Sequence, residues 1–174
     1  MVNLRSGPVD RSFRVEVTKD YLVFAAAHFV VFNEHEREPL HGHNYRLRVL
    51  AEGALDQYGF VLDFSVLKRM GRRFVDAIDH RVLLAARNPR LAYREEGDSV
   101  HVQYEGRPAY VLPAAEVVML PIVNTTVELI AEYLADQFER ELAVAGYRNL
   151  TMLEVEVEEN AKQSAIHRRR LFAD

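Results

Sequence analysis

The 174-residue sequence contains no cysteine, which excludes disulfides, thiolate nucleophiles and metal sites with thiolate ligands. It has no apolar run close to the roughly 20 residues of a membrane helix, and its N-terminus lacks the apolar segment of a signal peptide. It also lacks the positive charge that favours general nucleic-acid binding, because the net charge is −4. We therefore expect a cytoplasmic protein without membrane or nucleic-acid partners.

The composition is that of one globular domain, which we place at residues 1–174. Apolar residues make up 49% of the chain and charged residues 28%, as in soluble globular proteins. A basic cluster, His167-Arg168-Arg169-Arg170, lies late in the chain. It fits either a solvated terminus or a patch for phosphate or nucleic acid.

Two histidines, two positions apart, begin an alternating run of apolar and polar residues from His41 to Val49. Residues i and i+2 of a β-strand point to the same face of a sheet. His41, His43 and Tyr45 therefore share a face with apolar residues further along the run. The two imidazoles extend the buried face of this predicted strand.

A third histidine, His28, ends an extended segment in which Phe24 and Ala26 share its face. Three imidazoles with no fourth protein ligand are typical of a catalytic zinc site, which keeps one position open for water or substrate. Iron and nickel also bind imidazole, so the residue types leave the metal open. The alternative is that His41-Gly42-His43 is an ordinary start of a strand, with a glycine for close backbone approach.

Hydrophobic periodicity predicts a two-layer α+β domain in the order β-β-α-(hairpin)-α-β-β. The predicted strands cover residues 13–17, 21–28, 43–52, 60–63, 153–157 and 166–172, and residues 99–112 form a hairpin that turns at 105–108. We place His101 on the surface of this hairpin. Between His28 and His41 we expect a loop that brings Glu34, Glu36 and Glu38 near the histidines.

Two amphipathic helices follow from apolar residues at helical spacing. Ser65 would cap the first helix, and its apolar stripe consists of Leu67, Met70, Phe74 and Ile78. Thr126 would cap the second helix and Gly146 would close it. The apolar stripe of the second helix consists of Val127, Ile130, Leu134, Phe138 and Leu142.

Asp79 and His80 stand side by side at the predicted end of the first helix. A histidine at this place can complement the negative end of the helix dipole. An adjacent Asp-His pair can equally transfer protons in catalysis. The residues alone leave both interpretations open.

An ordered set of motifs runs along the chain: Phe24-Ala25-Ala26-Ala27-His28, His41-Gly42-His43-Asn44-Tyr45, Asp79-His80, Thr126-Val127-Glu128 and Glu159. In this order and spacing, from about residue 12 to residue 167, the chain resembles the 6-pyruvoyl-tetrahydropterin synthase and 6-carboxy-tetrahydropterin synthase family. The resemblance implies a T-fold, an antiparallel four-stranded sheet with two helices on one face. It also implies a homohexamer, a dimer of barrel-like trimers, with active sites between subunits.

The same resemblance implies roles for the histidines and for the Asp-His pair. In such enzymes the residues matching His28, His41 and His43 hold zinc, which coordinates the hydroxylated side chain of a dihydropterin substrate. The residues matching Asp79 and His80 serve proton transfer.

A glutamate on a late strand anchors the pterin ring in this family, and it matches Glu159. Thr126 and Glu128 would help to line the same pocket. The alternative for Glu159 is that it is simply one of several glutamates along its strand. The hairpin departs from the shorter family members, as an insertion at about residues 88–120 that either seals a subunit interface, narrows substrate access or decorates the surface.

The missing cysteine is the larger departure, because family members that make pyruvoyl- or carboxy-pterins carry a catalytic cysteine just before His-Gly-His. Here Glu38 lies three residues before His41, and Glu36 is the other carboxylate that could replace the thiol. This arrangement resembles the type III branch, where a glutamate replaces the cysteine and the product is 6-hydroxymethyl-7,8-dihydropterin, a folate precursor. A carboxylate is the weaker base, with an ordinary pKa of roughly 4.3 against roughly 8.5 for a thiol.

We therefore expect a zinc-dependent lyase acting on 7,8-dihydroneopterin or its triphosphate, with Glu38 as base and His80, oriented by Asp79, as its acid-base partner. The expected product is 6-hydroxymethyl-7,8-dihydropterin. The alternatives are 6-carboxy-5,6,7,8-tetrahydropterin synthesis in the queuosine pathway and 6-pyruvoyl-tetrahydropterin synthesis. From another class comes a non-catalytic module that binds zinc or a pterin.

Overall fold

A six-stranded sheet forms the centre of the computed structural model, which describes residues 12–171 apart from the side chains of Lys19 and Tyr21. The strand order is β7-β3-β1-β2-β8-β9, and the strands are β1 (Phe13–His28), β2 (His41–Gly53), β3 (Arg81–Ala85), β7 (Val117–Leu120), β8 (Leu150–Asn160) and β9 (Gln163–Arg170). β1, β2, β8 and β9 pair antiparallel, as predicted. β3 and β7 are additional, and they join the other edge of β1 in parallel.

Strand β1 is one long strand where the sequence predicted two. Its pairing with β2 shifts register between Thr18 and Val23, so that the polar residues expected to break the strand form an irregularity within it. Such a bulge bends a strand without ending it. His28 therefore belongs to a strand that pairs with β2 on both sides of the irregularity.

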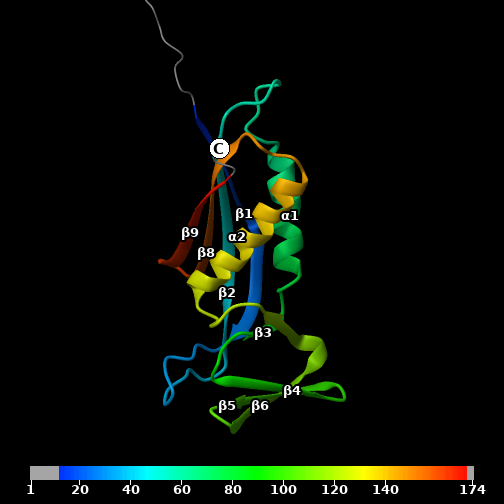
Figure 1. The fold of residues 1–174 in the computed structure, drawn as a ribbon, viewed down its shortest axis with the longest axis vertical. Helices are drawn as coiled ribbons and strands as arrows, with labels where there is room; N and C mark the ends of the chain where they lie inside the picture. Colours follow the sequence, from blue (N-terminus) through cyan, green and yellow to red (C-terminus); the bar gives the residue numbers. More distant parts are fainter. Residues whose placement is uncertain (1–11, 172–174) are drawn as a thin grey trace, which may run out of the picture.

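Two helices, α1 (Phe64–Asp76) and α2 (Val127–Val144), lie on one side of the main sheet (Figure 1). Both predicted apolar stripes face the core, and Phe74 meets Phe138 edge to face with ring centroids 4.8 Å apart. The architecture is thus the predicted α+β class. Within the main sheet, the core ends at the stacked pair Phe24 and Tyr45, whose ring centroids are 4.8 Å apart.

Two local predictions at α1 are wrong. The residue that caps α1 is Asp63, because its carboxylate accepts a hydrogen bond from the Ser65 N–H at 2.8 Å. Residues 60–63 are not a strand, since they form the bends that lead into this cap. At α2, Thr126 occupies the predicted N-cap position, but its side chain makes no capping hydrogen bond, and Gly146 follows the C-cap with a φ of +83° that favours glycine.

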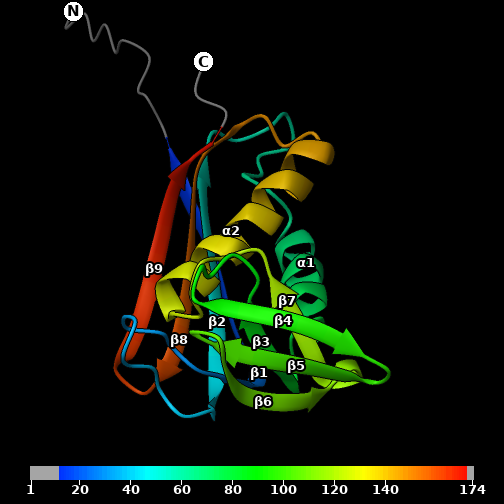
Figure 2. The ribbon, with the colours of Figure 1, turned by 60° about the horizontal axis from the view of Figure 1, so that its bottom comes forward.

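A separate three-stranded sheet consists of β4 (Leu91–Glu96), β5 (Ser99–Tyr104) and β6 (Arg107–Pro113), followed by a short 3-10 helix at Ala114–Glu116. β5 and β6 are the predicted hairpin, whereas β4 was not predicted. His101 lies on β5 with a side chain that is 32% exposed, 3.4 Å from the exposed Glu96. Figures 1 and 2 show this small sheet at the end of the main sheet that carries the loop between β1 and β2.

The C-terminal basic cluster lies on β9 and not on a solvated tail. Arg169 contacts Asp136 and Glu139 of α2 at 2.5 Å each, and Arg168 and Arg170 are exposed. Phe172, where the last predicted strand would end, lies outside the described residues. Within the described part of the chain, no helix has the length and apolar character to cross a membrane.

Candidate metal centre and active site

Three histidines meet where β1 and β2 leave the core. His28 pairs directly with His41 across the two strands, and Ala26 pairs with His43. One ring nitrogen from each histidine lies within 4.8 Å of the other two. The i and i+2 pattern of β2 and the register of β1 therefore produce the cluster that the sequence predicted.

Backbone carbonyls fix which nitrogen His28 and His41 offer to this cluster. His28 Nδ1 lies 2.7 Å from the carbonyl oxygen of Thr125, and His41 Nδ1 lies 2.9 Å from that of Pro39. A carbonyl can only accept, so each Nδ1 carries a hydrogen, and in the neutral form of each ring it is Nε2 that keeps the lone pair able to bind a metal. This is the outer hydrogen bonding that holds metal-binding histidines in one tautomer.

His28 gives the strongest sign that the cluster fits a metal ion. Its side chain is 2% exposed, and its Nε2 is buried with no hydrogen-bond partner among the described residues. Burial lowers the pKa of His28 and so favours the neutral form, the form that binds metal. Gly42 allows the backbones of β1 and β2 to approach closely, because a Cβ there would lie 3.2 Å from the Ala26 carbonyl oxygen.

Glu159 lies beside the cluster at the end of β8. Its Oε1 is 3.5 Å from His28 Nε2 and 3.6 Å from His43 Nε2. Like the histidines, it continues the buried face of its strand, two residues beyond Val157. Burial, and then the negative charge of Glu159, raise the pKa of Tyr45, so its hydroxyl stays protonated beneath the site.

Glu38 approaches His41 from the loop between β1 and β2. Its Oε2 lies 4.0 Å from His41 Nε2 and accepts a hydrogen bond from the Val30 N–H at 3.1 Å. The Glu38 N–H donates back to the Val30 carbonyl at 2.8 Å. Glu36 is exposed, and its carbonyl accepts hydrogen bonds at the tip of the loop. Of the two candidate carboxylates, the structure thus brings Glu38 to the cluster.

Asp79 and His80 form a pair in the turn after α1. Asp79 Oδ2 lies 3.0 Å from His80 Nδ1, and its Oδ1 accepts a hydrogen bond from the Ala25 N–H at 2.8 Å. Burial acts to raise the pKa of Asp79, but the hydrogen bonds from Ala25 and His80 outweigh it and hold the pKa below its ordinary value. His80 has a φ of +55°, and its side chain is 83% exposed.

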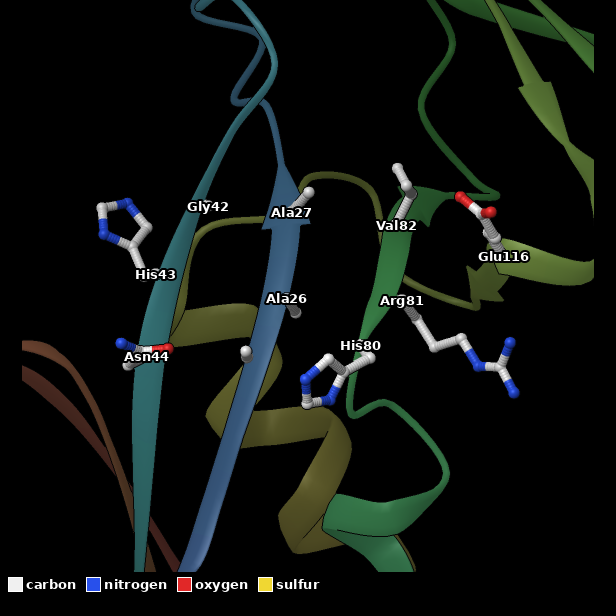
Figure 3. A pocket seen from close by; sticks show the side chains of 10 residues that line it. Ala26, Ala27, Gly42, His43, Asn44, His80, Arg81, Val82 and Glu116 are labelled. Atoms are coloured by element: carbon white, nitrogen blue, oxygen red, sulfur yellow. The ribbon is translucent and has the colours of Figure 1, made fainter.

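A cavity of about 410 Å³ lies between this pair and the start of β2. Its walls are Ala25, Ala26, Ala27, Gly42, His43, Asn44, His80, Arg81, Val82 and Glu116. Figure 3 shows His43 on the β2 side and His80 at the start of β3, with β1 between them. The small side chains of the Ala25-Ala26-Ala27 run leave this space open.

Thr126 and Glu128 do not contact the cluster through any hydrogen bond or ion pair recorded within residues 12–171, and Glu128 is exposed. The neighbouring Thr125 does so instead. It is 1% exposed, its carbonyl holds His28, and its hydroxyl donates to the Phe29 carbonyl at 2.7 Å. Its role escaped the sequence analysis because no spacing signal links it to His28, which lies 97 positions away.

Comparison with known proteins gives the same picture. The model of the family "6-pyruvoyl tetrahydropterin synthase" matches residues 16–170. A putative 6-carboxy-5,6,7,8-tetrahydropterin synthase of Methanocaldococcus jannaschii is 30% identical over 151 residues, which are 86% of this chain and 91% of that protein. A dihydroneopterin monophosphate aldolase of Pyrococcus furiosus is 43% identical over 60 residues, which are 34% of this chain and 50% of that protein.

Solved structures also match nearly the whole chain. The crystal structure of a 6-pyruvoyl tetrahydropterin synthase from Plasmodium vivax has a TM-score of 0.87 and 29% identity, and covers 93% of this chain and 100% of that chain. Structures of the same enzyme with a catalytic glutamate replaced by alanine or cysteine match with TM-scores of 0.86 and 30% identity, again covering 93% and 100%. With the T-fold, the histidine cluster and a family match along most of its length, the chain belongs to the 6-pyruvoyl tetrahydropterin synthase family.

Proposed function

We propose that this protein is a zinc-dependent lyase that acts on the side chain of a dihydropterin. The observation that carries the proposal is the convergence of three imidazole nitrogens with the carboxylates of Glu38 and Glu159 beside them. Three imidazole ligands suit zinc and leave a position for substrate oxygen. Bound zinc would make the substrate hydroxyls more acidic by withdrawing charge.

In this proposal each carboxylate has a separate task. Glu38, whose Oε2 faces His41, removes a proton from the substrate side chain. Glu159 accepts hydrogen bonds from the amino and ring N–H groups of the pterin, which orients the ring. Thr126 and Glu128 would line the pterin pocket. No hydrogen bond or ion pair recorded within residues 12–171 links them to the histidine cluster.

The names of the relatives favour 6-carboxy-5,6,7,8-tetrahydropterin synthesis over the hydroxymethyl product expected from the sequence. The Methanocaldococcus relative carries that name and matches along most of both chains. We therefore place 6-carboxy-5,6,7,8-tetrahydropterin synthesis first, with 7,8-dihydroneopterin triphosphate as substrate. A chain without cysteine would have to perform it with Glu38 in place of the thiol.

A retro-aldol cleavage to 6-hydroxymethyl-7,8-dihydropterin is the second candidate, and the position of Glu38 favours it. Glu38 would take the proton of the C2′ hydroxyl, the C1′–C2′ bond would break, and a two-carbon aldehyde would leave. His80 would return a proton to C1′. A relative named as an aldolase, and Plasmodium variants made at a catalytic glutamate, support this candidate.

We further propose that the enzyme is a cytoplasmic homohexamer with active sites between subunits. The exposed His80 supports this arrangement, because a proton donor must be enclosed with its substrate to work well. In a single chain the pair contacts β1 and leaves the imidazole largely in solvent.

Product identity tests the proposal. Zinc-loaded protein would be incubated separately with 7,8-dihydroneopterin, its monophosphate and its triphosphate, and the products identified by chromatography and mass spectrometry. A carboxy-pterin supports the first candidate and a hydroxymethyl-pterin the second. Tight pterin binding without product from any substrate would overturn both in favour of a binding module.

The variant Glu38→Gln provides the matched test of mechanism. It keeps the size of the side chain but removes the base, so we expect kcat to fall by roughly 10² to 10⁴ while zinc remains bound. Turnover that survives Glu38→Gln but is lost with zinc in His41→Ala would contradict the role of Glu38.

A further inference from the structure

We propose that the small sheet positions the active site through Tyr110, whose hydroxyl holds Glu38 and His41 at their working separation. The inference rests on the proposed function where it concerns turnover, and on the histidine cluster alone where it concerns metal binding. It assigns a role to the hairpin, for which the sequence allows three functions: sealing a subunit interface, narrowing substrate access or decorating the surface.

The Tyr110 hydroxyl oxygen receives two hydrogen bonds from the loop between β1 and β2. The Leu40 N–H donates to it at 2.9 Å, and Arg37 Nη1 donates at 2.6 Å. Leu40 directly precedes the metal ligand His41, and Arg37 directly precedes the proposed base Glu38. One oxygen atom on β6 therefore fixes the chain on both sides of the segment that joins base and ligand.

Arg37 strengthens this connection because it also binds the segment itself. Its Nη1 donates to the Glu38 carbonyl at 2.8 Å. Its guanidinium lies over the Tyr110 ring at 4.8 Å and over the Phe29 ring at 5.4 Å. The cation is thus held between aromatic faces, an arrangement that favours one orientation of the guanidinium.

The segment held by Tyr110 also contains the carbonyl group that sets the tautomer of His41. The Pro39 carbonyl, between Glu38 and Leu40, is the group that holds His41 Nδ1 at 2.9 Å. If the chain at Leu40 shifts, the Pro39 carbonyl and the His41 ring shift together. Displacements of about 1 Å at a catalytic site can cost 10²-fold in rate, so a remote hydroxyl can control turnover.

The test replaces Tyr110 by phenylalanine, which removes the hydroxyl and keeps the ring against Phe29. We expect kcat to fall at least tenfold with KM changed less than twofold. In the absence of substrate we expect Co²⁺ affinity, followed by its visible absorption, to fall about tenfold, as when an outer partner of a metal ligand is lost.

The matched control is Tyr104→Phe in the same sheet. The Tyr104 hydroxyl donates to the Asn33 carbonyl at 2.6 Å, so this variant also removes one bond between the small sheet and the loop, but away from Glu38. We expect its kcat and Co²⁺ affinity to stay within twofold of the parent. Equal losses in Tyr104→Phe and Tyr110→Phe would overturn the proposal, since they would show general support of the loop.

A second variant, Arg37→Met, keeps the aliphatic stem and removes the donors, and so replaces Tyr110→Phe if that protein does not fold. Parent-like kcat and Co²⁺ affinity in a folded Tyr110→Phe protein, or in Arg37→Met, would also overturn the proposal.

If the parent turns over no pterin, the proposed function fails, but the Co²⁺ titrations still decide whether Tyr110 positions His41. With turnover, combining Tyr110→Phe with Glu38→Gln should add little further loss of kcat, because both act on one base.

Discussion

The histidine cluster and the Asp79–His80 pair both contact β1, but the first is built around a buried histidine and the second carries an exposed one. His28, at the end of β1, is 2% exposed and is surrounded by groups from β2, β8 and the start of α2. His80 is 83% exposed, and it is linked to β1 through its own N–H and that of Ala25, by way of the Ala25 carbonyl and the neighbouring Asp79 carboxylate. The two regions lie roughly 10 Å apart along β1, at about 3.3 Å per residue.

The two regions thus depend on different parts of the molecule. Strand pairing alone assembles the histidine cluster within one chain, because β1 and β2 fix the three residues in register. The Asp79–His80 pair is held at its backbone, but the His80 side chain is 83% exposed. Metal binding should therefore be a property of the single chain, whereas turnover should depend on what encloses His80.

Metal affinity should separate the two regions most clearly. We expect His43→Ala to weaken zinc binding by at least about 100-fold, since it removes one of three ligands. His80→Ala should leave the zinc affinity within twofold. Competition with a chromogenic chelator measures both, and comparable losses in the two variants would abolish the distinction.

Substitution of His80 should lower turnover without changing the metal content. His80→Gln removes the acid-base group and should lower kcat by roughly 10². Zinc content, measured on the same sample by elemental analysis, should equal that of the parent. A His80→Gln enzyme with parental kcat would mean that the histidine has only a structural role at the end of α1.

The pair should also contribute pH-dependent stability. Asp79→Ala should lower the free energy of unfolding by about 1.5 kcal/mol at pH 7, because the carboxylate accepts the Ala25 N–H. The pKa of Asp79 is depressed in the fold, so its contribution is complete above the ordinary pKa of about 3.9 and is lost as the pH falls through the lower folded value. Urea unfolding should give equal differences at pH 7 and 5 and a smaller one near pH 3.

The smallest expected effect concerns the backbone at His80. Its φ of +55° is unfavourable for residues with a Cβ, so His80→Gly should be more stable than His80→Ala by about 1 kcal/mol. Thermal or urea unfolding of the two variants measures this difference directly. Equal stabilities would show that the turn relaxes to another conformation once the imidazole is gone.

The sequence predicted the histidine cluster because its members follow local geometry. The alternation after His41 sets one face, and the i and i+2 rule then places both imidazoles toward His28. The helix stripes were equally predictable, since spacing alone places them toward the core. The cap of α1 was assigned to Ser65 because Asp63 and Ser65, two positions apart, are both residue types that can cap, and the hydrogen-bond geometry selects Asp63.

The missed features depend on contacts between distant segments. β3 and β7 are short apolar runs, which periodicity alone does not distinguish from other buried segments. Thr125 and Tyr110 carry no local signal, because each acts on a group at least 70 positions away. The sequence could place Glu36 and Glu38 in the same loop, but only the pairing of Glu38 with Val30 distinguishes them.

Strand β9 has a consequence for aggregation. It is an outer strand of the main sheet, and an open strand edge is a template for uncontrolled pairing with other chains. Arg168 and Arg170 are exposed along it, so two copies of this edge repel each other. A strand with acidic side chains would meet the same edge without that repulsion. The edge of β9 can therefore remain available to an acidic strand while it disfavours the pairing of identical edges that builds fibres.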